Sequence, residues 1–184
     1  SWIRVRRDRQ LADALVLAAQ SESMRERAST DQLTGLRNRH GLLDAVAANS
    51  DGPRAVAMID VDRLKAVNDE YGHGAGDDYI RAIGARLAAN VSRRDLVGRW
   101  GGDEFVIVFP LDAEAAITVM ERVVDAVVAT PLVFGDDAVA PAISVGVAAL
   151  VDGRSFEDSV AAADAAMYVS KRAGSNRVTA GSMA

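Results

Sequence analysis

The feature that most constrains this fold is a pair of strand-forming segments joined by two glycines. Apolar and β-branched residues run through 96–100 and again through 105–109, and Gly101 and Gly102 stand between them. This spacing predicts a β-hairpin whose glycines take the positive φ angles of a tight turn. The hairpin therefore sets the register of two neighbouring strands.

Two acids leave this turn together. Asp103 and Glu104 are adjacent, so a regular strand would place their side chains on opposite faces, whereas a turn can bring both towards one site. The plain alternative is a Gly-Gly turn with two solvated acids, because such turns between strands are common.

A second segment favours a site. Residues 55–59 are apolar at every position, which is typical of a fully buried strand, and they run directly into Asp60, Val61 and Asp62. Asp60 and Asp62 share one face of the extended chain, and the Val61 carbonyl lies between them. Together with the acids of the hairpin, these oxygens form a set suited to Mg²⁺, with phosphate oxygens completing the coordination.

The composition excludes several other functions. The chain has 184 residues, of which 49% are hydrophobic and 26% charged, and this is typical of one globular domain. It contains no cysteine and two histidines, which excludes disulfides and thiolate chemistry and disfavours a histidine metal cluster. A net charge of -5 argues against nucleic-acid binding, so a small ligand is expected.

Residues 1–28 differ from the rest of the chain. They begin with a basic cluster, followed by alanine-rich, helix-favouring sequence; the cluster consists of Arg4, Arg6, Arg7 and Arg9. The cluster is either a solvated helix face or the juxtamembrane end of a segment that follows a membrane helix. We expect residues 1–28 to form a helical linker to an upstream sensor or membrane domain, and residues 29–184 to form a cytoplasmic catalytic domain.

Polar residues after the buried strand suggest a nucleotide site. Three glycines within 72–76 predict a loop where another group approaches the backbone. Asn68 and Asp77 flank this loop, and their donors and acceptors could match the edge of a guanine. Lys65 lies one short helical turn beyond the acids, within reach of a phosphate.

The order of elements predicts the fold class. Capping residues around Asn38 start a helix, and helical and strand patterns then alternate; helices are expected at 76–90, 113–129 and 156–172, and further strands at 141–148 and 176–179. This order indicates an α+β (α/β) sandwich with a mostly antiparallel sheet of about five strands. Its site should lie at the ends of the first strand and the hairpin.

These residues resemble the GGDEF domain of diguanylate cyclases from about Asp31 to Val178. The resemblance rests on six segments in order: Asp31-Gln32-Leu33-Thr34-Gly35-Leu36-Arg37-Asn38-Arg39, Asp60 to Asp69, Tyr71 to Asp77, Arg99-Trp100-Gly101-Gly102-Asp103-Glu104-Phe105, Ser144 to Val147, and Ala163 to Tyr168. It implies a palm-like sheet related to that of nucleotide cyclases and polymerases. It also implies an enzyme that condenses two GTP molecules into cyclic di-GMP with release of pyrophosphate.

The resemblance implies a role for each matching residue. Asp60, the Val61 carbonyl and Asp103 would hold Mg²⁺, with Mn²⁺ as an alternative, and Glu104 would assist the metal or deprotonate the attacking 3′-hydroxyl. The implied substrate-binding residues comprise the guanine readers, the triphosphate cradle and the glycines of the turn: Asn68, Asp77, Arg63, Leu64, Lys65, Lys171, Gly101 and Gly102. Each domain would bind one GTP, so catalysis would require a homodimer.

Two other functions remain open. The first is a catalytically silent GGDEF module that binds GTP and has a regulatory or dimerisation role; such modules usually lose an acid or glycine of the hairpin, and all are present here. The second is a cyclase with relaxed base choice, against which Asp77 argues.

The chain departs from the family pattern at four positions. The product-inhibition motif, Arg-x-x-Asp, reads Ser92-Arg93-Arg94-Asp95, so its leading arginine is missing and Arg93 or Arg94 would have to substitute. Leu64 stands where the family usually has an aromatic residue. His40 and Ser175 stand where the family usually has arginine.

Overall fold

The computed structural model describes residues 28–49 and 52–181, so the predicted linker lies almost wholly outside the described residues. The named elements, in chain order, are β1 (Arg37–Asn38), α2 (Arg39–Ala48), β2 (Ala55–Asp62), α3 (Leu64–Tyr71), α4 (His73–Ala89), β3 (Leu96–Arg99), β4 (Glu104–Phe109), α5 (Ala113–Val128), β5 (Leu132–Phe134), β6 (Asp137–Val139), β7 (Ala142–Ala149), α6 (Phe156–Arg172) and β8 (Arg177–Ala180).

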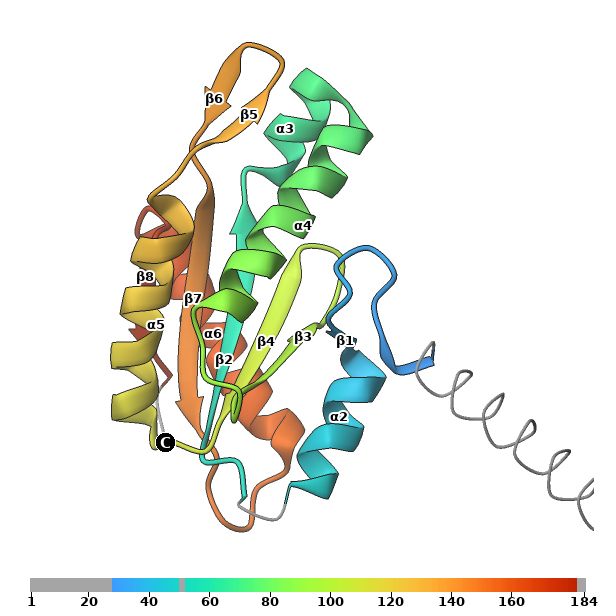
Figure 1. Ribbon diagram of the computed structural model, residues 1–184. Coiled ribbons are helices and arrows are strands. Elements are labelled where there is room, and N and C mark those ends of the chain that lie inside the picture. Colours follow the sequence, from blue (N-terminus) through green and yellow to red (C-terminus); the bar gives the residue numbers. More distant parts are fainter. Residues whose placement is uncertain (1–27, 50–51, 182–184) are drawn as a thin grey trace, which may run out of the picture.

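One twisted sheet forms the centre of the domain (Figure 1). Its strand order is β1-β3-β4-β2-β7-β8, and β2 lies antiparallel to both of its neighbours, β4 and β7. β3 and β4 form the predicted hairpin, while β1 and β8 add parallel strands at the two edges. The α+β class and the mostly antiparallel sheet are confirmed, with six strands in place of about five. The sequence did not predict the two-residue β1.

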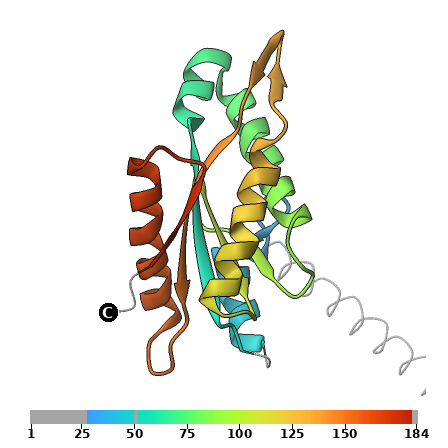
Figure 2. The same ribbon diagram turned by 90° about the vertical axis from the view of Figure 1, so that its left-hand side faces the viewer.

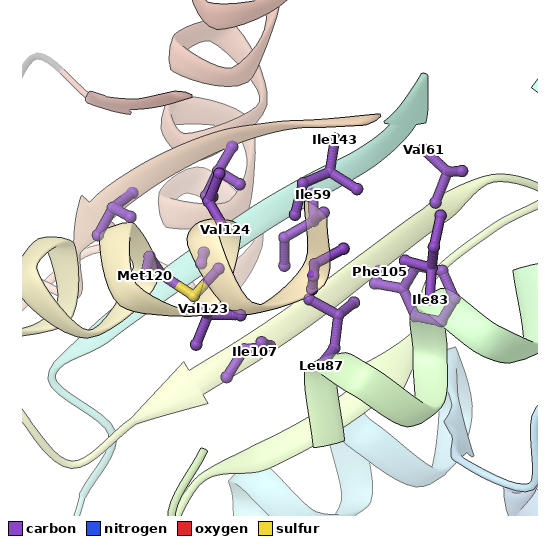
Figure 3. Close-up of a cluster of buried hydrophobic side chains, with 14 of the residues drawn as sticks. Ile59, Val61, Ile83, Leu87, Phe105, Ile107, Met120, Val123, Val124 and Ile143 are labelled. Atoms are coloured by element: carbon purple, nitrogen blue, oxygen red, sulfur yellow. The ribbon is translucent and has the colours of Figure 1, made fainter. Parts of the chain in front are cut away.

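Helices cover both faces of the sheet (Figure 2). Side chains of β2 alternate between the two layers: Ile59 and Val61 pack with residues of α4 and α5, whereas Val56 and Met58 pack with residues of α2 and α6. Figure 3 shows the larger cluster, in which Phe105 and Ile107 of β4 meet the α4 and α5 side chains. Asp60 and Asp62, two and four residues after Met58, therefore lie on the α6 side.

The predicted glycine loop at 72–76 is wrong. A helix, α3, begins directly after β2, and α4 begins at His73, so Gly74 and Gly76 lie inside the first turn of α4. Gly72 alone separates the two helices, and its φ of 85° is a conformation that glycine adopts without strain. Sequence reasoning read three glycines as a break, but tertiary contacts overrode their low helix propensity.

A second hairpin was also not predicted. β5 and β6 form a separate two-stranded sheet between α5 and β7, and Figure 1 shows it beside α3. Each strand has three residues, which is too short for an alternating pattern to stand out in the sequence. The helices expected at 76–90, 113–129 and 156–172 and the strands expected at 141–148 and 176–179 agree with the structure to within three residues.

Gly146 explains how closely α6 packs on the sheet. A Cβ at this position of β7 would lie 2.0 Å from the Ala163 carbonyl oxygen and 2.2 Å from the Met167 nitrogen, both in the α6 backbone. Backbone atoms cannot rotate away as a flexible side chain can. A hydrogen atom at Gly146 is therefore a condition for the observed distance between α6 and β7.

We predict that Gly146→Ala lowers the free energy of unfolding by about 3 kcal/mol or more, because the added methyl group pushes a whole helix away. Gly74→Ala is the matched control, since its Cβ would meet no described atom within 4 Å and alanine favours a helix. Urea denaturation of both variants measures the difference. Equal stabilities would contradict this account of α6 packing.

Candidate active site

The buried strand and the hairpin bring two predicted site residues face to face. Asp60 of β2 is paired directly with Glu104 of β4, and side chains opposite each other on antiparallel strands share one face of the sheet. Glu104 alternates with Val106 and Val108, which pack towards α6, so both acids point to that side. The Val61 N–H donates to the Asp103 carbonyl at 2.9 Å and ties the turn to the end of β2.

A cation from α6 completes this cluster. The Lys171 Nζ donates to Asp60 Oδ1 at 2.7 Å and lies 3.9 Å from Asp62 Oδ1. Asp60 is 8% exposed and Asp62 6%, and burying a charge is costly unless an opposite charge accompanies it. Lys171 is 46% exposed, so its ammonium also faces solvent, from which a ligand could approach.

Two residues that the sequence analysis missed hold Asp62. The Ser144 hydroxyl donates to Asp62 Oδ2 at 2.8 Å, and the Tyr79 hydroxyl donates to the Asp62 carbonyl at 3.3 Å while accepting from the Ala142 N–H at 3.1 Å. Ser144, Tyr79 and Asp62 are all buried. Asp62 therefore anchors the end of β2, and Asp60 is the more available acid. Ser144 lay in a segment that carried the resemblance, but no sequence pattern connects it with Asp62.

The cluster shifts the pKa values of its members. Burial raises the pKa of Asp60, and Lys171 offsets only part of that rise. Burial also raises the pKa of Glu104, and the negative charges of Asp103 and Asp164 raise it further. Burial acts to lower the pKa of Lys171, but its bond to Asp60 outweighs burial and raises the pKa. Asp164, on α6, is a further site neighbour that sequence reasoning did not single out.

The oxygen donors fit a divalent cation that is shared with phosphate. Asp60, Asp103 and Glu104 supply carboxylates at one end of the sheet, and hard oxygens are the ligands that Mg²⁺ prefers. Within residues 28–49 and 52–181, no three acidic or histidine side chains converge as a complete metal site. Metal binding by Asp60, Asp103 and Glu104 therefore stays a prediction.

The Gly-Gly turn differs from its prediction. The described backbone gives neither Gly101 nor Gly102 a positive φ angle, because the connection spans residues 100–103 and is not a two-residue turn. Space explains Gly101 better. A Cβ at Gly101 would lie 2.9 Å from Glu104 Oε2, and one at Gly102 would meet no described atom within 4 Å. Gly101 thus makes room for the Glu104 carboxylate, and Gly102 leaves the backbone of the turn accessible.

Arg99 fastens this turn to the opening segment of the domain. Its Nη2 and Nε donate to the Gly102 carbonyl at 2.6 and 3.1 Å, and its Nη1 donates to both oxygens of Asp31 at 3.2 Å. Asp31 is itself held by Thr34, whose N–H and hydroxyl donate to Oδ1 at 2.9 and 2.7 Å. One guanidinium therefore couples two segments that lie 68 residues apart.

Trp100 holds the turn from the other side. The Arg39 guanidinium lies 4.5 Å from the centre of the Trp100 ring, and the Phe156 ring packs edge-on against it at 6.4 Å. Trp100 borders a cavity of about 260 Å³, which Glu104 and Asp164 also line. The candidate site is therefore open on the side of Glu104 that faces α6.

The start of α3 offers backbone amides beside the acids. Arg63 has a φ of 66° and, among the described residues, no side chain caps the helix there, so the first N–H groups of α3 are available to an anion. Lys65, the predicted phosphate ligand, lies on this turn but pairs with Asp69 at 2.7 Å, and its side chain is 88% exposed. In this conformation the Lys65 side chain therefore does not contact Asp60 or Asp62.

The candidate base readers do lie together. A Cβ at Gly76 would fall 1.9 Å from Asn68 Oδ1, so the Asn68 amide rests directly on the Gly76 backbone, next to Asp77. The prediction that another group approaches the backbone among these glycines is confirmed, and that group is Asn68. This contact sets the end of α3 against the beginning of α4.

The Arg93, Arg94 and Asp95 segment lies at the opposite end of β3 from the Gly-Gly turn. The Ser92 N–H donates to Asp95 Oδ2 at 2.7 Å, and the Arg94 N–H donates to the Ser92 hydroxyl at 3.2 Å, which closes a tight turn. Burial raises the pKa of Asp95. Arg94 also lines a cavity of about 700 Å³ between α2 and the start of β3, together with His40.

Comparison with known proteins identifies the family. Residues 28–177 match the family model described as "Diguanylate cyclase, GGDEF domain". Diguanylate cyclase DgcP of Pseudomonas aeruginosa is 33% identical over 173 residues, and the response regulator PleD of Caulobacter vibrioides is 39% identical over 163 residues. The chain belongs to the GGDEF family of diguanylate cyclases, which confirms the resemblance. The matches cover 90% and 83% of this chain but 26% and 36% of those two relatives.

Solved structures share the fold. The coiled coil and GGDEF domain of DgcB from Caulobacter crescentus, solved in complex with c-di-GMP, superimposes with a TM-score of 0.86 at 30% identity and covers 98% of this chain and 100% of that one. SiaD of Pseudomonas aeruginosa, solved with its activator SiaC, gives a TM-score of 0.79 at 31% identity over 96% of this chain and 72% of that one.

Within the described residues, no helix has the length and apolar character that crossing a membrane requires.

The Asp31 to Arg99 pair should make stability depend on pH. Burial acts to raise the pKa of Asp31, but the bonds from Thr34 and the charge of Arg99 outweigh it and lower the pKa below 3.8. When a carboxyl group has a lower pKa in the folded state than in the unfolded state, its ionised form stabilises the folded protein. This stabilisation is complete above the unfolded-state pKa and is lost as the pH falls through the folded-state pKa.

We therefore predict that Asp31→Asn costs about 1 to 3 kcal/mol at pH 7, with a smaller cost at acidic pH. Urea denaturation from pH 7 down to the acid limit of folding measures the trend. Asp152→Asn, at an exposed loop position, is the control. A cost for Asp31→Asn that stays constant as the pH falls below 3.8 would contradict this account.

Proposed function

We propose that this domain is a diguanylate cyclase, which condenses two GTP molecules into cyclic di-GMP and releases pyrophosphate. The observation that carries the proposal is the direct pairing of Asp60 with Glu104 at one end of the sheet, with Lys171 bound to Asp60. This pairing supports the proposal because phosphoryl transfer relies on positioned charges, and the GGDEF hairpin of the chain is complete.

Recognition of GTP would be divided between the base and the phosphates. Asn68 and Asp77 supply an amide and a carboxylate for the guanine edge, and the Gly76 contact supports their being presented together. The uncapped amides after Arg63, with Leu64 as the first residue of α3, would receive phosphate oxygens. Lys65 would have to leave Asp69 to take part.

The chemical step would rely on the acid cluster. Mg²⁺, or Mn²⁺ in its place, would be held by Asp60, the Val61 carbonyl and Asp103, and when bound it supplies charge neutralisation for the transferring phosphoryl group. Glu104, whose pKa is raised, is suited to accept the proton of the attacking 3′-hydroxyl. Lys171 balances the charge of Asp60, and its half-exposed ammonium would be available to a phosphate oxygen if Asp60 held the metal.

Each domain would hold one GTP, so two copies must face each other as a homodimer. Residues 1–28 would form the helix that sets the relative position of the two domains, and residues 29–184 the catalytic unit. Holding two half-sites together raises the effective concentration of one GTP at the other. An upstream sensor or membrane domain would control the relative position of the two catalytic domains. The catalytic domains would lie in the cytoplasm.

We predict that the purified chain converts GTP with Mg²⁺ to cyclic di-GMP at a rate per chain that rises with protein concentration. Glu104→Gln should lower the rate by at least about 100-fold, because it removes the proton acceptor and a charge of the cluster. Glu114→Gln, at an exposed position of α5, is the control. Chromatography identifies the product. GTP binding without product even at high protein concentration would favour the silent module.

Gly76→Ala should raise KM for GTP by about tenfold or more, because the new methyl group displaces Asn68 from the base. Gly74→Ala, two residues earlier in the same helical turn, should leave KM unchanged. Steady-state kinetics of both variants makes the comparison, and circular dichroism verifies that α3 and α4 are intact. Equal KM values for the two variants would remove Asn68 from the substrate site.

A further inference from the structure

The β5–β6 hairpin touches the helix pair that carries the candidate base readers. The Phe134 ring of β5 stacks on Tyr71, the last residue of α3, with ring centres 5.6 Å apart and planes at 29°. Phe134 also packs against Tyr79 of α4 at 6.5 Å. From β6, Asp137 Oδ2 accepts a bond from the Tyr71 hydroxyl at 3.2 Å. Figures 1 and 2 show the hairpin and these helices at the same end of the domain.

These contacts matter because α3 is short. Its eight residues give too few internal hydrogen bonds for a stable helix, so its position depends on packing. Val67, next to Asn68, is buried in the core at the middle of α3, and Tyr71 packs against the same core at the C-terminal end. The Gly72 N–H bonds to the Asn68 carbonyl at 2.9 Å, so movement of Tyr71 and Gly72 also moves Asn68.

Tyr79 connects the same contact to the acids. Its ring is fully buried, and its hydroxyl bonds both to the Asp62 carbonyl at the end of β2 and to the Ala142 N–H at the start of β7. Phe134 therefore packs on Tyr71, which lies next to the base readers, and on Tyr79, which is hydrogen-bonded to the end of β2. The hairpin itself pairs with no strand of the main sheet, so side-chain packing fixes its place.

We propose that the β5–β6 hairpin is a positioning element for the nucleotide base, and that Phe134 is its main contact. Phe134 holds α3 and α4 so that Asn68 and Asp77 face one guanine edge together, without touching the nucleotide itself. This inference rests on the proposed function and extends it, because it assigns part of the selectivity for guanine to a segment outside the GGDEF hairpin.

The test compares binding of non-hydrolysable GTP and ATP analogues, with Mg²⁺, to the whole chain by titration calorimetry. Phe134→Ala should raise the Kd of the GTP analogue by roughly 3- to 10-fold, which is the effect expected from losing an aromatic contact. It should also lower the ratio of the Kd for the ATP analogue to the Kd for the GTP analogue. Phe134→Leu keeps apolar volume without a ring and should show the same direction of change. Phe134→Tyr should restore wild-type binding.

Val133→Ala is the matched control, since Val133 is the neighbouring residue of β5 and is 71% exposed. Thermal unfolding sets a temperature at which every variant is folded. The inference would be overturned if Phe134→Leu kept wild-type affinity and selectivity. It would also be overturned if the variants lost equal affinity for both analogues, and either result would leave the cyclase proposal intact. A wild-type chain with no preference for the GTP analogue would overturn the proposed function and this inference with it.

Discussion

The structure depends on charge balance at the end of β2. Asp60 and Asp62 are carboxylates on a strand that is otherwise apolar and almost fully buried, and such charges are costly without a partner. Lys171 supplies the partner from the last turn of α6, 111 residues later. That bond requires α6 to lie close over β7, and Gly146 provides the space. The ion pair and the close packing of α6 are thus two parts of one arrangement.

The Gly-Gly turn is rigidly held although it contains two glycines. Arg99 bonds the Gly102 carbonyl and Asp31 on one side, and Arg39 and Phe156 pack on Trp100 on the other. If the proposed function holds, such positioning suits phosphoryl transfer, because donors fixed in advance need no rearrangement when substrate binds. The opening segment of the domain contributes Asp31 and Arg39, which gives it a structural role at the site besides starting α2.

The two halves of the proposed nucleotide site are built differently. Asp60 and Glu104 stand on long, largely buried strands, whereas the candidate base readers stand on a short helix and near the start of the next. Short elements depend on outside contacts for their position. Asn68 resting on Gly76 and Phe134 stacked on Tyr71 are contacts of that kind.

The sequence by itself determined the order of the longer strands and helices, the GGDEF hairpin, the acids at the end of β2 and the family, because these follow from local periodicity and contiguous motifs. It did not determine the helical geometry of 73–76, the φ angles of the turn or the β5–β6 hairpin. Nor did it connect Ser144, Tyr79 and Asp164 to the acids. Those features arise from contacts between residues that are remote in the chain, such as Ser144 with Asp62, and only the tertiary structure decides which remote residues meet.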